Sequence, residues 1–146
     1  MKSSARVLIR KNDQILLMHR NKFGREYDIL IGGAVDLGEN LIQAAMREVA
    51  EESCLTIGSL KLVFIERVHE PYGTQYVFLS EYVSGEVRLD PNSDEFKINK
   101  IGNNLYEPTW YEISNLPSIE LLSPKLKAAL IDSFKNGFPD QPVDIT

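Results

Sequence analysis

The sequence has 146 residues, of which 43% are hydrophobic and 25% are charged, so its composition fits one globular domain and excludes a disordered chain. The 16 Lys and Arg residues against 21 Asp and Glu residues give a net charge of −5, which argues against broad binding to nucleic acid or to an anionic membrane. The single cysteine, Cys54, excludes an intramolecular disulfide and fits a reducing compartment. We therefore expect one domain over residues 1–146, in the cytoplasm, with no signal peptide, no membrane segment and no DNA or RNA partner.

The N-terminal part of the chain predicts strands. Its apolar segments lie at residues 6–10, 14–19 and 28–31. Lys11-Asn12-Asp13, between the first two segments, is typical of a β-hairpin turn. The polar residues 21–27 predict a loop before the third strand, which runs into a pair of glycines.

A helix follows the glycines. Asn40 is a good N-cap, and Gln43 three residues later completes a capping box, so we expect the helix to begin here and to end near Ser53. At 100° per residue, four apolar side chains share one stripe that predicts the buried face: Ile42, Ala45, Met46 and Val49.

The rest of the chain predicts three more strands and a closing helix, at residues 60–68, 75–83, 106–113 and 124–135. The first two of these strands flank a turn at residues 69–74, and the polar residues 90–104 predict a long loop. Pro108 confines its strand to a sheet edge or to an irregular start, because proline cannot donate to a neighbouring strand. Strands before, between and after two helices predict a layered α/β domain with a mixed sheet.

Three carboxylates, those of Glu48, Glu51 and Glu52, lie on the predicted helix in an arc of roughly 100° beside the apolar stripe. Like charges three and four residues apart repel, and the helix dipole disfavours negative charge near the C-terminal end. A hard divalent cation such as Mg²⁺ or Mn²⁺ would resolve the conflict, because it prefers carboxylate oxygens. A solvated acidic face explains the carboxylates alone equally well, so the spacing of the surrounding residues has to decide.

The residues from Gly33 to Leu55 resemble the signature of the Nudix hydrolase family, G-x5-E-x7-R-E-U-x-E-E-x-G-U, where U is a bulky aliphatic residue. Eight of its nine specified positions match: Gly33, Glu39, Arg47, Glu48, Val49, Glu51, Glu52 and Leu55. Cys54 replaces the signature glycine, which usually supplies a left-handed helix cap. A left-handed cysteine costs about 1 kcal/mol, so we expect a small buried residue at a slightly altered helix end in preference to a reactive thiol.

The resemblance implies an α/β/α sandwich and hydrolysis of the pyrophosphate link in a nucleoside diphosphate joined to another group, with Mg²⁺ or Mn²⁺ as cofactor. It implies that Glu51 and Glu52 are metal ligands and that Glu48 is a metal ligand or the base that activates water. The resemblance also implies two supporting roles: the Gly32 carbonyl joins the metal site, and Glu39 and Arg47 orient the loop.

Outside the signature, the resemblance implies a further acid on a loop near the last strands. Glu95 is the candidate for this metal-binding acid, with Asp94 and Glu107 as alternatives. Arg20 and Arg25 lie close in sequence to the glycines and are candidates for binding substrate phosphate.

Two functions fit the fold that the resemblance implies. The first is a nucleotide pyrophosphohydrolase acting on a nucleoside triphosphate or a related small nucleotide. The second is a non-catalytic sensor of a nucleotide or nucleotide sugar, which the intact carboxylates disfavour because a sensor does not need residues that destabilise its helix. Pro71 and Tyr72 nearly meet spacings associated in the family with ADP-ribose and with dinucleoside polyphosphates, so they do not discriminate between substrates. A homodimer is compatible with the family, without an interface signal in the sequence.

Overall fold

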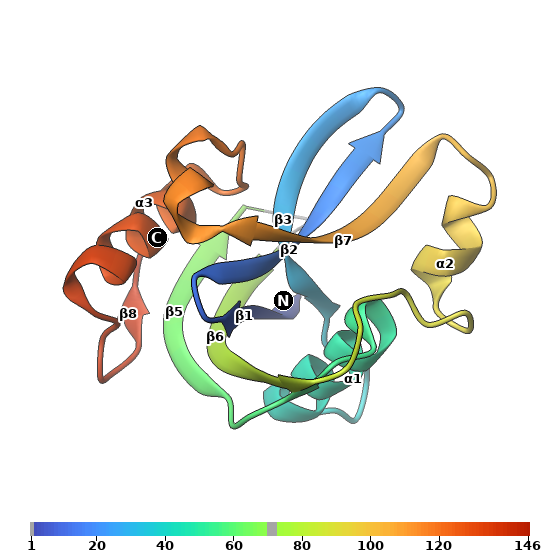
Figure 1. Ribbon diagram of the computed structural model, residues 1–146. Coiled ribbons are helices and arrows are strands. Elements are labelled where there is room, and N and C mark those ends of the chain that lie inside the picture. The colour runs from blue at the N-terminus through green and yellow to red at the C-terminus, as the bar shows by residue number, and fades with distance from the viewer. Residues whose placement is uncertain (1, 70–72) are drawn as a thin grey trace.

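A mixed β-sheet forms the centre of the computed structural model, which describes residues 2–69 and 73–146 (Figure 1). Its strands are β1 (Ser3–Lys11), β2 (Gln14–Lys22), β3 (Arg25–Ala34), β4 (Thr56–Ile57), β5 (Lys61–Val68), β6 (Gly73–Ser84), β7 (Asn104–Glu112) and β8 (Val143–Asp144). The helices are α1 (Leu41–Ser53), α2 (Asp94–Asn99) and α3 (Pro124–Asn136), and a 3₁₀ turn at Ile113–Ser118 precedes α3. Pro71 and Tyr72, considered above for substrate choice, lie outside the described residues.

The strand order is β7-β2-β3-β1-β6-β5-β8, with β4 paired to β6. Strands β1 and β6 run parallel, as do β5 and β8, while the remaining pairs are antiparallel. The strand that contains Pro108 is β7, which lies at one edge of this sheet as predicted.

Helices cover both faces of the sheet, so the predicted α/β/α sandwich with a mixed sheet is confirmed (Figure 1). Successive residues of a strand point to opposite faces, and the fully buried run 7–9 of β1 therefore feeds two cores. Val7 packs in the core beneath α1 with Ala45 and Val49, whereas Leu8 packs in the core beneath α3 with Leu130. No helix in the described part of the chain is long and apolar enough to cross a membrane.

Two predicted loops were wrong. Strands β2 and β3 extend into the polar stretch 21–27 and are joined by a tight turn at Phe23 and Gly24, whose φ angles are 53° and 92°. The side chains of this hairpin end are exposed, which is why their polarity resembles that of a loop. The stretch 90–104 contains α2, because the hydroxyl of Ser93 caps the helix by accepting the N–H of Phe96 at 3.2 Å.

The predicted N-terminal end of α1 is confirmed. The Asn40 side chain accepts the N–H of Gln43 at 2.8 Å, and the Gln43 side chain accepts the N–H of Asn40 at 2.9 Å. The predicted buried stripe is partly wrong. Ala45 and Val49 are buried as predicted, whereas Ile42 and Met46 are 47% and 44% exposed. The buried face of the helix is turned toward the carboxylates instead, because it packs against the glycine pair at the end of β3.

The C-terminal end of α1 keeps the left-handed cap that the signature glycine would supply. Cys54 has φ 58° and ψ 20°, and its N–H donates to the carbonyl of Ala50 at 3.2 Å. The expected alteration of the helix end was therefore wrong, and Cys54 is half-buried. An L-residue in this conformation carries strain of about 1 kcal/mol.

Cys54→Gly should raise the free energy of unfolding by about 0.4–1 kcal/mol, because glycine adopts a positive φ without this strain. Urea denaturation in the presence of a chelator measures the difference as a higher midpoint at an unchanged slope. Cys54→Ala is the matched control, since alanine retains the Cβ atom and should give no such gain. A lower midpoint for Cys54→Gly would contradict the assignment of strain to this residue.

Candidate active site

Three carboxylates meet beside the end of β3, two from α1 and one from α2. Glu48, Glu52 and Glu95 each present one oxygen atom, and these atoms lie within 4.8 Å of one another. Glu48 and Glu52 are 6% and 5% exposed, and Glu52 accepts the N–H of Gly32 at 2.9 Å. Burial raises the pKa of Glu48 to about 7 and raises the pKa of Glu52 well above its usual range, with the Glu48 charge adding to the latter effect.

The glycine pair makes room for these carboxylates. A Cβ atom on Gly33 would lie 2.7 Å from a carboxylate oxygen of Glu48, so a side chain here would displace that carboxylate. Gly32 has φ 143°, and a Cβ atom on it would lie 2.1 Å from the carbonyl oxygen of Ala5. The first glycine is therefore required by the packing of β3 on β1, and the second by the carboxylate cluster.

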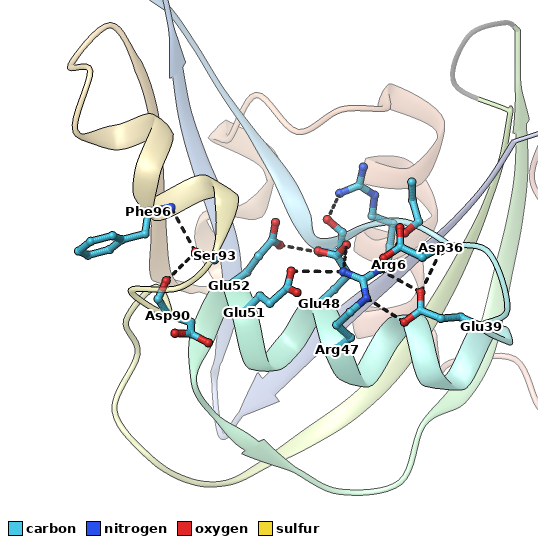
Figure 2. A network of polar contacts seen from close by, with 12 residues as sticks. Arg6, Asp36, Glu39, Arg47, Glu48, Glu51, Glu52, Asp90, Ser93 and Phe96 are labelled. Carbon is cyan, nitrogen blue, oxygen red and sulfur yellow. Dashed lines mark hydrogen bonds and ion pairs between the residues drawn. The ribbon is translucent and has the colours of Figure 1, made fainter.

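Arg47 connects the cluster to the loop before α1, as Figure 2 shows. Its guanidinium forms a bidentate pair with Glu39, with Nε–Oε2 at 2.8 Å and Nη2–Oε1 at 3.1 Å. Nη1 donates to Glu48 at 3.0 Å and to Glu51 at 3.2 Å, while Nη2 donates to the carbonyl of Ala34 at 3.0 Å. The Glu39 carboxylate raises the pKa of Arg47, which stays charged and partly offsets the repulsion among the carboxylates.

Glu51 lies apart from the three-carboxylate cluster. Its side chain is 32% exposed and pairs with Arg47, and partial burial raises its pKa against the opposing effect of that arginine. Its backbone carbonyl accepts the N–H of Asp90 at 2.8 Å, which fastens the segment before α2 to α1. At the other end of α2, the Asn99 side chain exchanges two hydrogen bonds with the backbone of Tyr106, at 2.7 and 2.8 Å. These two anchors hold α2 so that Glu95 reaches the cluster.

Arg6 is a site residue that sequence reasoning missed. Its Nη1 donates to the carbonyl of Gly32 at 2.9 Å, and its Nε donates to the side chain of Gln75 at 3.1 Å. Burial lowers the pKa of this guanidinium, while the charges of Glu52 and Glu48 oppose the decrease. The available signal was a charged residue between Ala5 and the apolar run 7–9 of β1, a strand covered on both faces.

A cavity of about 520 Å³ adjoins Arg6, and four cations are among its lining residues: Arg6, Arg20, Lys22 and Arg25. Arg20 is buried, donates from Nε to the carbonyl of Leu105 at 3.1 Å, and lies 3.7 Å over the ring of Tyr106. Both arginines proposed from the sequence to bind phosphate thus lie in the wall of this cavity. Of the two alternatives to Glu95, Asp94 and Glu107 are both exposed and lie outside the three-carboxylate cluster.

Comparison with known proteins agrees with this geometry. The family model described as NUDIX domain matches residues 2–125. The chain belongs to the NUDIX domain family. It is 33% identical over 113 residues to the NAD-capped RNA hydrolase NudC of Edwardsiella ictaluri, a match that covers 77% of this chain and 40% of that protein. The NudC of Escherichia coli is 33% identical over 111 residues, again with 39% of that protein covered. This NUDIX domain therefore spans about two fifths of the length of these relatives.

Solved structures share the fold of this NUDIX domain. An ADP-ribose pyrophosphatase from Streptococcus suis superposes with a TM-score of 0.65 at 21% identity, over 98% of this chain and 96% of the other. A NUDIX hydrolase from Nitrosomonas europaea superposes with a TM-score of 0.71 at 14% identity, over 98% and 78% of the two chains. At these identities the similarity establishes the architecture of the sandwich.

The donor set of the cluster fits a hard divalent cation. Three carboxylates whose oxygens lie within 4.8 Å of one another match the oxygen ligands that Mg²⁺ and Mn²⁺ prefer. Burial raises the pKa of both Glu48 and Glu52, and the charges of Arg47 and Arg6 only partly oppose this effect. A cation at this position would supply further positive charge.

The metal-free NUDIX domain should lose stability as the pH rises from about 5 to about 7. An unfolded glutamate releases its proton near 4.5, whereas folded Glu48 retains it up to about 7, so the unfolded state binds fewer protons in this interval. We expect a decrease on the order of 2–3 kcal/mol, measured by urea denaturation with a chelator. Glu48→Gln should remove the part of this slope that Glu48 contributes and leave the part that Glu52 contributes, and Mg²⁺ should reverse the loss in the wild type. Constant stability across the interval would contradict the burial of a charged carboxylate.

Arg47→Lys should lower the free energy of unfolding by about 1–3 kcal/mol. Lysine cannot form a bidentate pair with Glu39, and its single ammonium group cannot bond to Glu39, Glu48, Glu51 and Ala34 at the same time. Chemical denaturation in the presence of Mg²⁺ measures the loss. Arg10→Lys is the matched control, because Arg10 pairs with Glu81 on the surface, and there we expect a change within about 0.5 kcal/mol. Equal effects of the two substitutions would count against the proposed role of Arg47 in holding the cluster.

Proposed function

We propose that this NUDIX domain hydrolyses a pyrophosphate bond in a nucleoside diphosphate linked to another group, with Mg²⁺ or Mn²⁺ as cofactor. The observation that carries the proposal is the carboxylate cluster of Glu48, Glu52 and Glu95 next to a cavity lined by four cations. Acids that hold a metal and cations that hold phosphates are the two parts that pyrophosphate cleavage needs. The names of the relatives, a hydrolase of NAD-capped RNA and an ADP-ribose pyrophosphatase, support the same reaction class.

In this proposal the ligands are Glu48, Glu51, Glu52 and Glu95, with the carbonyl of Gly32 as a further donor. When bound, the cation supplies the positive charge that stabilises the phosphate oxygens in the transition state. The Gly32 carbonyl has two lone pairs, so its hydrogen bond from Arg6 leaves one lone pair for a second partner. Glu48 is also the candidate base, because its carboxylate lies in the cluster and is held in its charged form by Arg47 at 3.0 Å, so it can accept a proton from the attacking water.

Glu39 and Arg47 act as positioning residues in this scheme. Their bidentate pair fixes the loop that enters α1, and the remaining N–H groups of Arg47 orient the carboxylates of Glu48 and Glu51. The pair therefore holds the ligands in place before substrate arrives, which lowers the entropic cost of assembling the site.

Arg20 and Arg25 bind the phosphates of the substrate from the cavity wall. Arg20 is already fixed by its contacts with Leu105 and Tyr106, so it meets an anion without losing much side-chain freedom. Arg25 lies 5.0 Å over the ring of Tyr27 and is exposed, which suits a contact that forms and breaks in each turnover. The substrate itself is a nucleoside triphosphate or a related small nucleotide, and the relatives add NAD and ADP-ribose to the candidates.

Glu52→Gln should abolish metal-dependent turnover, because it removes a buried ligand, while retaining or raising the thermal stability of the metal-free protein. The assay measures phosphate and nucleotide products from nucleoside triphosphates, NAD, NAD-capped RNA, ADP-ribose, nucleotide sugars and dinucleoside polyphosphates, with Mg²⁺ and with Mn²⁺. Activity that survives in the variant would overturn the assignment of Glu52 as a ligand.

Glu86→Gln is the matched control for this assay, since Glu86 is exposed and lies on the loop after β6, outside the cluster. It should turn over every substrate at the wild-type rate. If the wild type hydrolyses none of the panel but is stabilised by one of its nucleotides in a thermal shift, the function is that of a sensor and the hydrolase proposal fails.

A further inference from the structure

The cavity contains a buried carboxylate that the proposed reaction does not use. Glu66 on β5 is 7% exposed and lies in the cavity wall. Its two oxygens lie 2.7 and 2.6 Å from the hydroxyl of Ser123, which donates its hydrogen to them. The same hydroxyl accepts the N–H of Leu126 at 3.2 Å as the cap of α3, so its lone pair faces the helix and its hydrogen faces Glu66.

This carboxylate has few partners for a buried charge. Among the described residues, no lysine or arginine forms an ion pair with Glu66 within 4.0 Å, and Ser123 is its one side-chain donor. A carboxylate offers about four lone-pair positions, and acids are rarely buried without a charged partner. The unused lone pairs face a cavity of about 520 Å³, which indicates that a ligand supplies the missing donors.

Glu66 lies at the far end of the cavity from the metal-binding carboxylates. Across the sheet, Glu66 on β5 pairs with Gln75 on β6, the Gln75 side chain bonds to Arg6 on β1, and Arg6 pairs with Gly32 on β3. Three strand spacings separate Glu66 from Gly32, roughly 14 Å. In a nucleotide the ribose hydroxyls lie a few bonds from the α-phosphorus, whereas the edge of the base lies farthest from it. Phosphates near Arg6 and the cluster therefore bring the edge of the base toward Glu66.

The walls between these two ends suit a flat base. Tyr27 and the apolar side chains of Ile29, Val77 and Leu126 line the cavity and offer no competing charge. A carboxylate accepts best from two adjacent N–H donors, and among the common bases guanine presents such a pair, with its ring N1–H beside its exocyclic amino group. Adenine presents its amino group beside a ring nitrogen with a lone pair, which a carboxylate repels.

We propose that Glu66 is the specificity-determining residue of this cavity and selects nucleotides with a guanine-type base edge. The proposal rests on the proposed function for the position of the phosphates, but it concerns binding and does not require turnover. The two ends of the cavity then contact different parts of the bound nucleotide. Cations near Arg6 bind the phosphates, and Glu66 accepts the N–H donors of the base.

The test measures dissociation constants of GDP, IDP, ADP and 2′-deoxy-GDP by calorimetry, without metal, for the wild type and for Glu66→Gln. We expect the wild type to bind GDP at least tenfold more tightly than ADP, IDP with intermediate affinity because it lacks the exocyclic amino group, and 2′-deoxy-GDP like GDP. Glu66→Gln should weaken the binding of GDP at least tenfold. The binding of ADP should stay unchanged or become tighter, since an amide pairs well with adenine. Glu81→Gln, an exposed glutamate on β6, is the matched control and should bind all four ligands like the wild type.

Three outcomes would overturn the proposal. Equal binding of GDP and ADP by the wild type would show that the cavity does not select the base, and a loss confined to 2′-deoxy-GDP would assign Glu66 to the ribose. If Glu66→Gln weakened the binding of every nucleotide equally, the role of Glu66 would be to position Ser123 as the cap of α3. If this variant does not fold, the absence of the order GDP, IDP, ADP in the wild type still overturns the proposal. Selective binding without turnover would refute the proposed hydrolase and leave the specificity intact.

Discussion

The site depends on one constraint, the burial of two like-charged carboxylates where α1 meets the end of β3. Glu48 and Glu52 would repel each other and lose hydration there without compensation. Two features make the arrangement stable enough to exist: the guanidinium of Arg47 lies against Glu48, and Gly33 leaves the space that the carboxylate fills. The helix thus gives up part of an apolar contact, which explains why Ile42 and Met46 face solvent. Binding of a cation would relieve the remaining repulsion, and this relief would contribute to the free energy of cation binding.

The features that sequence reasoning predicted correctly are those whose causes are local. The capping box of Asn40 and Gln43 fixed the start of α1, the spacing from Gly33 to Leu55 identified the family, and Pro108 is on an edge strand. The features it missed depend on contacts between distant segments. Glu66 meets Ser123 across 57 positions of sequence and Arg6 meets Gln75 across 69, so neither pair leaves a periodic pattern. The predicted face of α1 was wrong for the same reason, since it is set by the glycines of β3 and not by the helix alone.

Charge is distributed very unevenly in this protein. The chain carries a net charge of −5, yet one cavity gathers four cations beside three acids. The negative surface disfavours long polyanions in general, while the cavity provides positive charge at the depth of a small phosphorylated ligand. Under the proposed function, the position of these arginines would favour a small nucleotide over extended nucleic acid. A capped RNA end that enters by its nucleotide would be compatible with this distribution.

The anchoring of α2 has a consequence for how such a site can diversify. The segment that contains Glu95 is fastened at two points, Asp90 to Glu51 and Asn99 to Tyr106, and both fasteners lie outside the segment's interior. Exchanging side chains between these points leaves both anchors in place, whereas an insertion before Glu95 within α2 would turn this side chain by about 100°. The third carboxylate of the cluster, Glu95, therefore comes from a segment whose side chains can be substituted without altering its two anchors. Substitutions in this segment would change the carboxylate that faces Glu48 and Glu52 while the buried pair on α1 stays as it is.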